Sequence, residues 1–297
     1  MTHLTSRRTA LASFAGMLAW TGNGRAQTVK PPTIVPEHLL LKRDGVTFSR
    51  PTEITNPWLP MKPGMRYIYD GSTISADGKA VPHRIVLNIT DLVKVVDGVP
   101  NLVSYDLDYS NGELEEAELA FFAQDDDGNV WHFGQYPEEY ENGRFLAAPA
   151  WLPGIEGARA GIMMKVDPKL GEPSYSQGYG PVVSWTDRGE THQVGQEVVI
   201  GDKKYTNVLV IKETAVGEEG AWQTKYYAQG VGNIKVGYLG ENDKSKETLV
   251  LTSVEMMSEE EMVATRNRAL ALERSGYRRS PDVYGKTAPS TVRQPAR

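Results

Sequence analysis

One short stretch of the chain, residues 121–135, gathers several side chains that could do chemistry. It runs F-F-A-Q-D-D-D-G-N-V-W-H-F-G-Q, with three consecutive aspartates followed by asparagine, tryptophan and histidine. Asp127-Gly128 is a dipeptide that accepts the positive φ angles of a tight turn between antiparallel strands. We therefore expect a hairpin with a two-residue turn, in which Phe122 lies opposite Phe133.

The hairpin could carry acid–base catalysis. Successive side chains of a strand point to opposite faces, so a two-residue turn places Asp125 and His132 on the same face. A carboxylate beside an imidazole can act as a general acid–base pair. A catalytic site would therefore use His132, Asp125 and Glu118, and His83 and Lys225 are further candidates elsewhere in the chain.

The same turn could instead bind a metal ion. Asp125, Asp127 and Asn129 occupy alternate positions and carry oxygen atoms of the kind that divalent cations bind. The helix–loop–helix calcium motif is excluded, because it needs glycine at the sixth position and glutamate at the twelfth, whereas here glycine is fourth and Tyr136 is twelfth. No other cofactor motif is evident, since the chain has neither a phosphate-binding glycine loop nor a paired-histidine spacing. The plainest alternative for these aspartates is a solvated turn.

Aromatic and amide side chains indicate a different function, the binding of a small ligand. Antiparallel barrels commonly enclose cavities for small molecules. Aromatic residues at strand spacing are also typical of a hydrophobic core, so this interpretation competes with a purely structural one. The candidate ligand-binding residues are Phe122, Gln124, Trp131, Trp151, Tyr175, Tyr179, Tyr226 and Tyr227.

The segments that must position these residues follow a period of two, which predicts β-strands. No strand alternates with a helix, and this favours antiparallel pairing. We expect an all-β domain over residues 64–257, an antiparallel meander that forms a curved sheet, a half-barrel or a barrel. The expected strands are Arg66–Ile74, Arg84–Val96, Asn101–Tyr109, Glu115–Gln124, Asn129–Gln135, Asn207–Thr214, Gln223–Ala228 and Thr248–Glu255.

Residues 136–181 interrupt this pattern with many prolines and glycines. A long irregular segment inside a compact domain is usually functional or disordered. Because this one also contains aromatic residues that should pack, we expect it to form a lid over the sheet.

The N-terminus has the features of an export signal. Residues 1–26 contain no acids, the pair Arg7-Arg8, a short apolar run and small residues near the end of the segment. The paired arginines indicate a twin-arginine signal, with a general secretory signal as the alternative. The apolar run is too short for a membrane span. We therefore expect a periplasmic or secreted protein without a transmembrane segment, in which residues 27–63 form an extended lead into the sheet.

The C-terminus is expected to be peripheral. Residues 258–261 are S-E-E-E, which matches a helix capping box and predicts a helix over 258–275. Residues 276–297 are polar and contain prolines, and we expect a disordered tail.

Composition excludes several classes of function. The 297 residues carry a net charge of −6, whereas a nucleic-acid-binding protein would show a basic patch or stripe. There is no cysteine, so disulfides, thiolate nucleophiles and zinc–thiolate sites are excluded. The sequence leaves the oligomeric state open.

Three motifs point to a known family: the run at 121–135, K-Y-Y-A-Q-G-V-G-N-I-K at 225–235, and F-x-x-x-x-x-I-T-N-P-W-L-P-x-x-P-G at 48–64. With these motifs the chain resembles a widespread family of secreted bacterial proteins that carry F-A-Q-D-x-D-G-N-V-W-Y-F-G-E and K-Y-Y-A-P-G-V-G. It departs from that pattern at His132, where the family has tyrosine, and at Gln135, where it has glutamate. The Gly-Val-Gly turn is also similar to one in periplasmic half-barrel lipid carriers. The resemblance implies a relative and no established activity.

Two functions follow as hypotheses. The first is an exported protein that binds an apolar or aromatic-rich small ligand in a β-sheet cavity. The alternative is an exported enzyme that acts by acid–base chemistry on a small molecule or polymer fragment, with its His/Asp site in the 118–135 hairpin. An interaction protein that uses the acidic strand Glu113–Glu118 and the tail is a third possibility.

Overall fold

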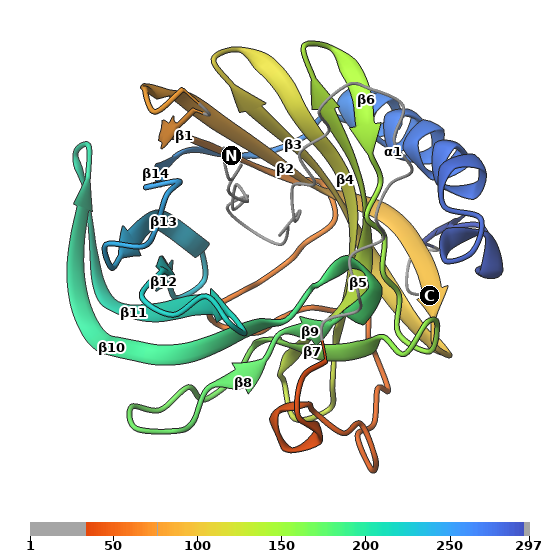
Figure 1. Ribbon diagram of the computed structural model, residues 1–297, viewed down its shortest axis with the longest axis horizontal. Helices are drawn as coiled ribbons and strands as arrows, with labels where there is room; N and C mark the ends of the chain where they lie inside the picture. The colour runs from red at the N-terminus through yellow and green to blue at the C-terminus, as the bar shows by residue number, and fades with distance from the viewer. Residues whose placement is uncertain (1–33, 76, 294–297) are drawn as a thin grey trace.

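The chain folds into one strongly curved antiparallel sheet with the shape of a nearly closed barrel (Figure 1). The computed structural model describes residues 34–75 and 77–293, so the expected signal peptide lies outside the described residues. The predicted all-β class with a C-terminal helix is confirmed. The strands are β1 (Met65–Ile74), β2 (Ala80–Val96), β3 (Val99–Ser110), β4 (Glu113–Gln124), β5 (Val130–Glu141), β6 (Arg144–Ala147), β7 (Arg159–Met164), β8 (Tyr175–Ser176), β9 (Gly178–Tyr179), β10 (Asp187–Ile200), β11 (Lys203–Ala215), β12 (Trp222–Ala228), β13 (Gly232–Leu239), β14 (Thr248–Met256) and β15 (Thr291–Val292). The helical elements are η1 (Glu37–Leu39), η2 (Pro181–Val183), α1 (Glu259–Arg279) and η3 (Tyr284–Lys286).

The strands follow one another mainly as a meander, and two pairings join segments that are far apart in the sequence, β1 with β14 and β15 with β2. The order around the sheet is β8-β10-β11-β12-β13-β14-β1-β2-β3-β4-β5-β7-β9, and β1 pairs with β14 although the two are far apart in the sequence. The two ends of this order, β8 and β9, are consecutive in the chain, and this brings the sheet back close to its starting edge. Such curvature gives the sheet an inner and an outer face.

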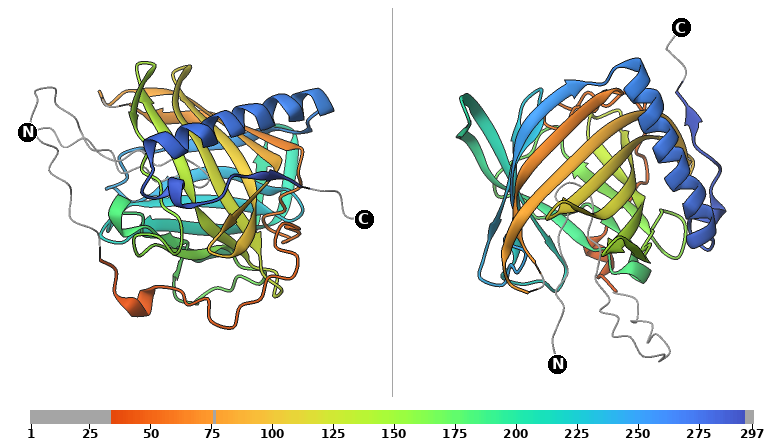
Figure 2. Two further views of the ribbon diagram at one scale, coloured as in Figure 1. Left: turned by 90° about the vertical axis from the view of Figure 1, so that its right-hand side faces the viewer. Right: turned by 90° about the horizontal axis from the view of Figure 1, so that it is seen from above.

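Both faces of the central strands are covered. The inner face carries a hydrophobic cluster that includes Tyr69, Leu87 and Tyr227. The outer face carries a second cluster between the sheet and α1, which includes Phe121 and Leu272. Figure 2 shows α1 lying across the outside of the barrel. Because successive residues of a strand contribute to opposite clusters, β4 and β5 are apolar on both sides.

The segment 136–181 is more regular than the sequence suggests. β5 continues to Glu141, and β7 pairs with β5 in the same sheet. Trp151 is tied to the sheet by reciprocal backbone hydrogen bonds with Gln135, at 3.0 and 3.2 Å. Much of this segment therefore belongs to the wall of the barrel and is not a separate lid.

Residues 276–293 are ordered, which corrects the expected disordered tail for the described part of residues 276–297. The capping box forms as predicted, with the Ser258 side chain accepting from the Glu261 amide and the Glu261 carboxylate accepting from the Ser258 amide. The helix α1 then runs to Arg279, η3 follows, and β15 pairs with β2. Gly276 lies inside α1, and its missing side chain makes room for the Tyr284 ring, which would lie 2.9 Å from an added Cβ.

A buried ion pair holds this C-terminal segment to the barrel. The ammonium group of Lys94 on β2 is 3.0 Å from the Glu273 carboxylate of α1 and donates to the Ala288 carbonyl at 2.8 Å. It also lies 4.3 Å from the centre of the Tyr284 ring. A charged side chain inside an apolar layer must find such partners. Lys94 finds Glu273 in the predicted helix, and Tyr284 and Ala288 in the residues that were expected to form a tail. Among the described residues, no helix is long and apolar enough to cross a membrane.

Candidate ligand-binding site

The 121–135 hairpin forms with a register that differs by one residue from the expected one. Phe122 pairs with His132 instead of Phe133, and the turn is a loop over residues 125–129. A one-residue shift moves the side chains of a strand to the other face of the sheet. The proposed pairing of Asp125 with His132 is therefore wrong.

His132 is enclosed by aromatic side chains. Its side chain is 0% exposed, stacks on Phe122 with ring centres 5.2 Å apart, and meets the edges of Trp151 and Trp185. Its Nδ1 is 3.3 Å from the Gln177 carbonyl oxygen. Burial lowers the pKa of His132 to about 3, so the imidazole is neutral at physiological pH. It is a core residue of the barrel, and no carboxylate of the described residues is paired with it for acid–base work.

Asp125 organises its own turn. One carboxylate oxygen accepts from the Asn129 amide at 2.7 Å, and the other accepts from the Asn129 side chain at 2.9 Å and from the Trp131 indole at 2.7 Å. The Asn129 side-chain oxygen accepts from the Val166 amide, and Asp127 is exposed. These oxygens are used in hydrogen bonds within the protein. Within residues 34–75 and 77–293, no group of three or more His, Cys, Asp or Glu side chains could hold a metal ion.

The three motifs noted in the sequence meet at one end of the barrel. The Gln124 side-chain oxygen accepts from the amide of Asn56 at 2.8 Å, and the Asn56 side chain donates to the Gly128 carbonyl at 2.8 Å. Gly230 in the third motif donates its amide to the Pro57 carbonyl at 2.8 Å. The loops 54–61, 125–129 and 228–232 are thus hydrogen-bonded into one assembly.

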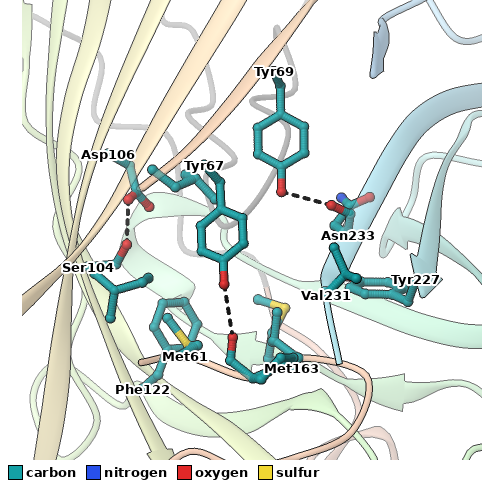
Figure 3. Close-up of a pocket in the computed structure, with 15 residues that line it drawn as sticks. Met61, Tyr67, Tyr69, Ser104, Asp106, Phe122, Met163, Tyr227, Val231 and Asn233 are labelled. Atoms are coloured by element: carbon teal, nitrogen blue, oxygen red, sulfur yellow. Dashed lines mark hydrogen bonds between the residues drawn. The ribbon is translucent and has the colours of Figure 1, made fainter. Parts of the chain in front are cut away.

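A pocket lies next to this assembly, inside the barrel (Figure 3). The space between its wall atoms, including its mouth, is about 530 Å³. The cavity itself has a volume of about 40 Å³, which is room for roughly three water molecules at ~10–15 Å³ each. The pocket is therefore narrow, and most of its lining is apolar. It is lined by Leu59, Pro60, Met61, Tyr67, Tyr69, Leu87, Ile89, Ser104, Asp106, Phe122, Met163, Tyr227, Val231, Gly232 and Asn233.

A few polar groups stand in this apolar lining. Tyr69 donates its hydroxyl to the Asn233 carbonyl at 2.9 Å, and Ser104 donates to Asp106 at 2.5 Å (Figure 3). Asp106 is the one carboxyl group among the described lining residues. Burial raises its pKa to about 7, against the opposing effect of the Ser104 hydrogen bond.

Glu118 lies on β4 directly opposite Asp106 on β3. Its side chain is 1% exposed, and its Oε1 has no hydrogen-bond partner among the described residues. Burial, and then the nearby carboxyls of Glu116, Asp106 and Asp108, raise the pKa of Glu118 well above its ordinary value. Glu118 was predicted to act as a catalytic residue together with Asp125. The structure instead places Glu118 beside Asp106 on the inner face of the barrel, whereas Asp125 is hydrogen-bonded to Asn129 and Trp131.

The two other acid–base candidates are in ion pairs on the inner face. The His83 ring lies 2.5 Å from Asp108 and 3.0 Å from Glu247, and the Lys225 ammonium lies 2.6 Å from Glu213. Burial lowers the pKa of His83, but the two carboxylates outweigh it and raise the value to about 10. His83 is therefore an imidazolium that neutralises its acidic neighbours.

Two of the eight predicted ligand-binding residues, Phe122 and Tyr227, line the pocket. Trp131 lies in the outer cluster, and Tyr226 is half-buried with the Lys235 ammonium 4.9 Å from its ring. Gln124 positions the 54–61 loop, as described above.

The other three predicted residues help to close the barrel. Trp151 stacks on Trp185 with ring centres 5.6 Å apart, Tyr175 pairs with β10, and Tyr179 pairs with β7. None of the three lines the pocket.

Several pocket residues were missed, although the sequence carried signals for some of them. Tyr67 and Tyr69 alternate at strand spacing, which places both on one face of β1. Leu59 and Val231 belong to two of the recognised motifs, but nothing in a loop sequence fixes where its side chains point.

Comparisons with known proteins are sparse. No family model matches the chain, and no curated protein matches it. One similar solved structure, from Bacteroides fragilis NCTC 9343, is a candidate exported protein with a YmcC-like fold; it is 12% identical, with a TM-score of 0.37, covering 67% of this chain and 98% of that one. Another, from Parabacteroides distasonis ATCC 8503, is a candidate lipoprotein; it is 12% identical, with a TM-score of 0.28, covering 66% of this chain and 97% of that one. Similarity at this level assigns no function to this chain.

Proposed function

We propose that this protein is an exported binding protein that holds a small apolar ligand in the pocket inside its barrel. The observation that carries the proposal is the pocket itself, a narrow and largely apolar space bounded by strands on one side and by the three-motif loop assembly on the other. Apolar lining with a few placed polar groups is typical of small-molecule sites. Export rests on the Arg7-Arg8 segment at the N-terminus.

The shape of the pocket favours a slender ligand. The cavity volume of about 40 Å³ is well below the ~300–1,000 Å³ of typical ligand pockets, so the walls lie too close together for a broad ring system and must move apart to admit even a slender guest. Met61 and Met163 are in the lining, and methionine side chains are unbranched and adapt easily to a guest. A single alkyl chain fits these walls better than a flat aromatic group. Of the two ligand types expected from the sequence, apolar or aromatic-rich, we therefore propose the apolar one.

Filling the pocket tests the proposal. Val231→Trp adds a large side chain to the lining without removing a polar partner. We expect it to weaken the binding of a ten-carbon alcohol at least about tenfold, measured by isothermal titration calorimetry, because the alkyl chain loses its apolar surroundings.

Val199→Trp is the matched control. It makes the same change at a side chain that is 66% exposed on β10, so binding should not change. Equal binding by wild type, Val231→Trp and Val199→Trp would show that the alcohol binds elsewhere, and absence of binding by all three would remove the proposed function.

A further inference from the structure

We propose that the ligand carries a cationic end group, such as an ammonium, which binds to the carboxyl pair of Asp106 and Glu118 at the inner end of the pocket. This inference rests on the proposed function and specifies the class of ligand. An apolar chain would then occupy the space between Met61, Phe122 and Tyr227, with its charged end toward β3 and β4.

The register of the sheet brings the two carboxyls together. Asp106 and Glu118 are directly opposite each other on β3 and β4, a position that places Cβ atoms about 4.5–5.5 Å apart. Both side chains point to the inner face, since Asp106 lines the pocket and Glu118 shares its face. One small cation at the end of the pocket could contact both.

One carboxyl oxygen of Glu118 has no hydrogen-bond partner among the described residues. A buried oxygen without a hydrogen-bond partner costs about 1–3 kcal/mol, so such atoms are rare in native proteins. The Oε1 atom of Glu118 is in this state although the side chain is only 1% exposed. An N–H donor on the ligand would satisfy this oxygen.

Two neighbouring acids on the inner face already have cationic partners. Asp108 is paired with His83, and Glu213 is paired with Lys225. Among the described residues, neither Asp106 nor Glu118 forms an ion pair. Glu139 is a further buried acid without an ion pair among the described residues, but it does not line the pocket. Asp106 does line it, with Glu118 directly opposite, so this pair is the one placed to meet a cation on a ligand.

The charge state of this pair depends on pH. The titratable groups that share its surroundings are Glu116 on β4, Asp108 on β3, His83 on β2, Tyr67 and Tyr69 on β1, Glu139 on β5, which pairs with Glu116, and Tyr227 on β12, which lines the same pocket. Only His83 among them is cationic, and Asp108 and Glu247 hold it. Because the pKa of Asp106 is raised to about 7, the pair gains negative charge, and with it affinity for a cation, as the pH rises through neutrality.

A matched series of ligands tests the inference. The sample is the full protein purified from the cells that make it. Decylammonium, decanol and decanoate share one alkyl chain and differ in charge, and each is titrated calorimetrically below its micellar concentration. At pH 8 we expect decylammonium to bind at least about tenfold more tightly than decanol, and decanoate to bind most weakly. Between pH 8 and pH 5.5 the affinity for decylammonium should fall severalfold, because burial raises the pKa of Asp106 to about 7 and this group takes up a proton over the interval.

Three variants locate the effect. Asp106→Asn and Glu118→Gln keep the size of the side chain, and each should reduce the preference for ammonium over alcohol, measured on the same variant as the ratio of its affinities for decylammonium and decanol. Glu139→Gln is the matched control, because Glu139 is also a buried carboxyl whose pKa burial raises to about 7, but it lies on β5 outside the pocket lining. It should change neither affinity. Thermal unfolding of each variant checks that the barrel is intact.

Each outcome separates this inference from the proposed function. If decanol and decylammonium bind equally well, or decanoate binds best, the cationic end group is wrong and the apolar pocket stands. If none of the three ligands binds, the proposed function fails as well. An ammonium preference that survives both Asp106→Asn and Glu118→Gln would also overturn the inference, because the cation would then bind elsewhere.

Discussion

Two histidines inside the same barrel hold opposite charge states because their neighbours differ. His132 touches aromatic rings and a carbonyl group, so burial dominates and lowers its pKa to about 3. His83 is also buried, but it lies between Asp108 and Glu247, which raise its pKa to about 10. The side-chain type alone therefore predicts neither charge nor function; the immediate contacts decide both.

Neither imidazole should titrate near neutral pH. Nuclear magnetic resonance between pH 5.5 and 8 should show His83 as the imidazolium and His132 as the neutral form throughout. The pKa of His83 is higher in the folded than in the unfolded protein, so its contribution to stability is present below about pH 6.5 and is lost as the pH rises toward 10. The pKa of His132 is lowered, so its contribution is present above about pH 6.5 and is lost as the pH falls toward 3. A midpoint between pH 6 and 7 for either residue would contradict these environments.

At the scale of elements, the 125–129 turn holds the hairpin on which the site depends. Asp125 accepts three hydrogen bonds within this turn, while the neighbouring Asp127 is exposed. Through Gly128 and Gln124 the hairpin also holds the 54–61 loop that forms part of the pocket wall.

Replacing Asp125 and Asp127 one at a time should distinguish the aspartate that organises the turn from the one that is only solvated. Asp125→Ala leaves buried donors unpaired and should lower the free energy of unfolding by about 2 kcal/mol or more. Asp127→Ala, two residues away, should change it by less than about 0.5 kcal/mol. Chemical denaturation measures both, and a similar cost for the two substitutions would show that the turn is not organised by Asp125.

The sequence predicts where most strands lie better than it predicts which residues pair across them. Period-two patterns and Asp-Gly or Asn-Gly turns predicted most strands, because those signals are local. Asp97 and Asn111 adopt the positive φ angles that their turns require, at 46° and 52°. In the 121–135 hairpin, however, Asp125 closes a longer loop with its side chain, and this shifted the register by one residue.

The errors at the C-terminus and in the site have the same origin. Lys94 lies in a strand, where a lysine is expected to be solvated, and only the folded structure brings it to Glu273. Asp106 and Glu118 are likewise ordinary strand residues until β3 and β4 pair. Contacts between distant segments decide these environments, and a single sequence gives no local signal for them.

At the scale of the whole molecule, the inner face is richer in acids than in bases, and this should make the empty barrel sensitive to alkali. Burial raises the pKa values of Asp106 and Glu139 to about 7, above those of the unfolded chain. Stability from these groups is therefore full below about pH 4 and is lost as the pH rises through 7. His83 acts in the same direction at higher pH.

The melting temperature of the ligand-free protein should therefore fall from pH 5 to pH 9. Each kcal/mol of lost stability corresponds to about 2–4 °C for a chain of this size range. Circular dichroism at pH 5, 7 and 9 measures the trend, and Asp106→Asn should flatten it. A melting temperature that rises steadily over this range would show that folding does not raise the pKa values of the inner carboxyls.

The pairing of β1 with β14 also sets the time at which the barrel can form. Arg66 and Glu255, which form an ion pair across this seam, are 189 residues apart. At roughly 5–20 residues per second, the ribosome needs about 10–40 s to add the second partner after the first. During that interval the edge of β1 and its two inward tyrosines have no partner, and long-range pairing of this kind folds slowly even when complete. The first strand of the sheet must therefore be kept from pairing with other chains until nearly the last strand has been made.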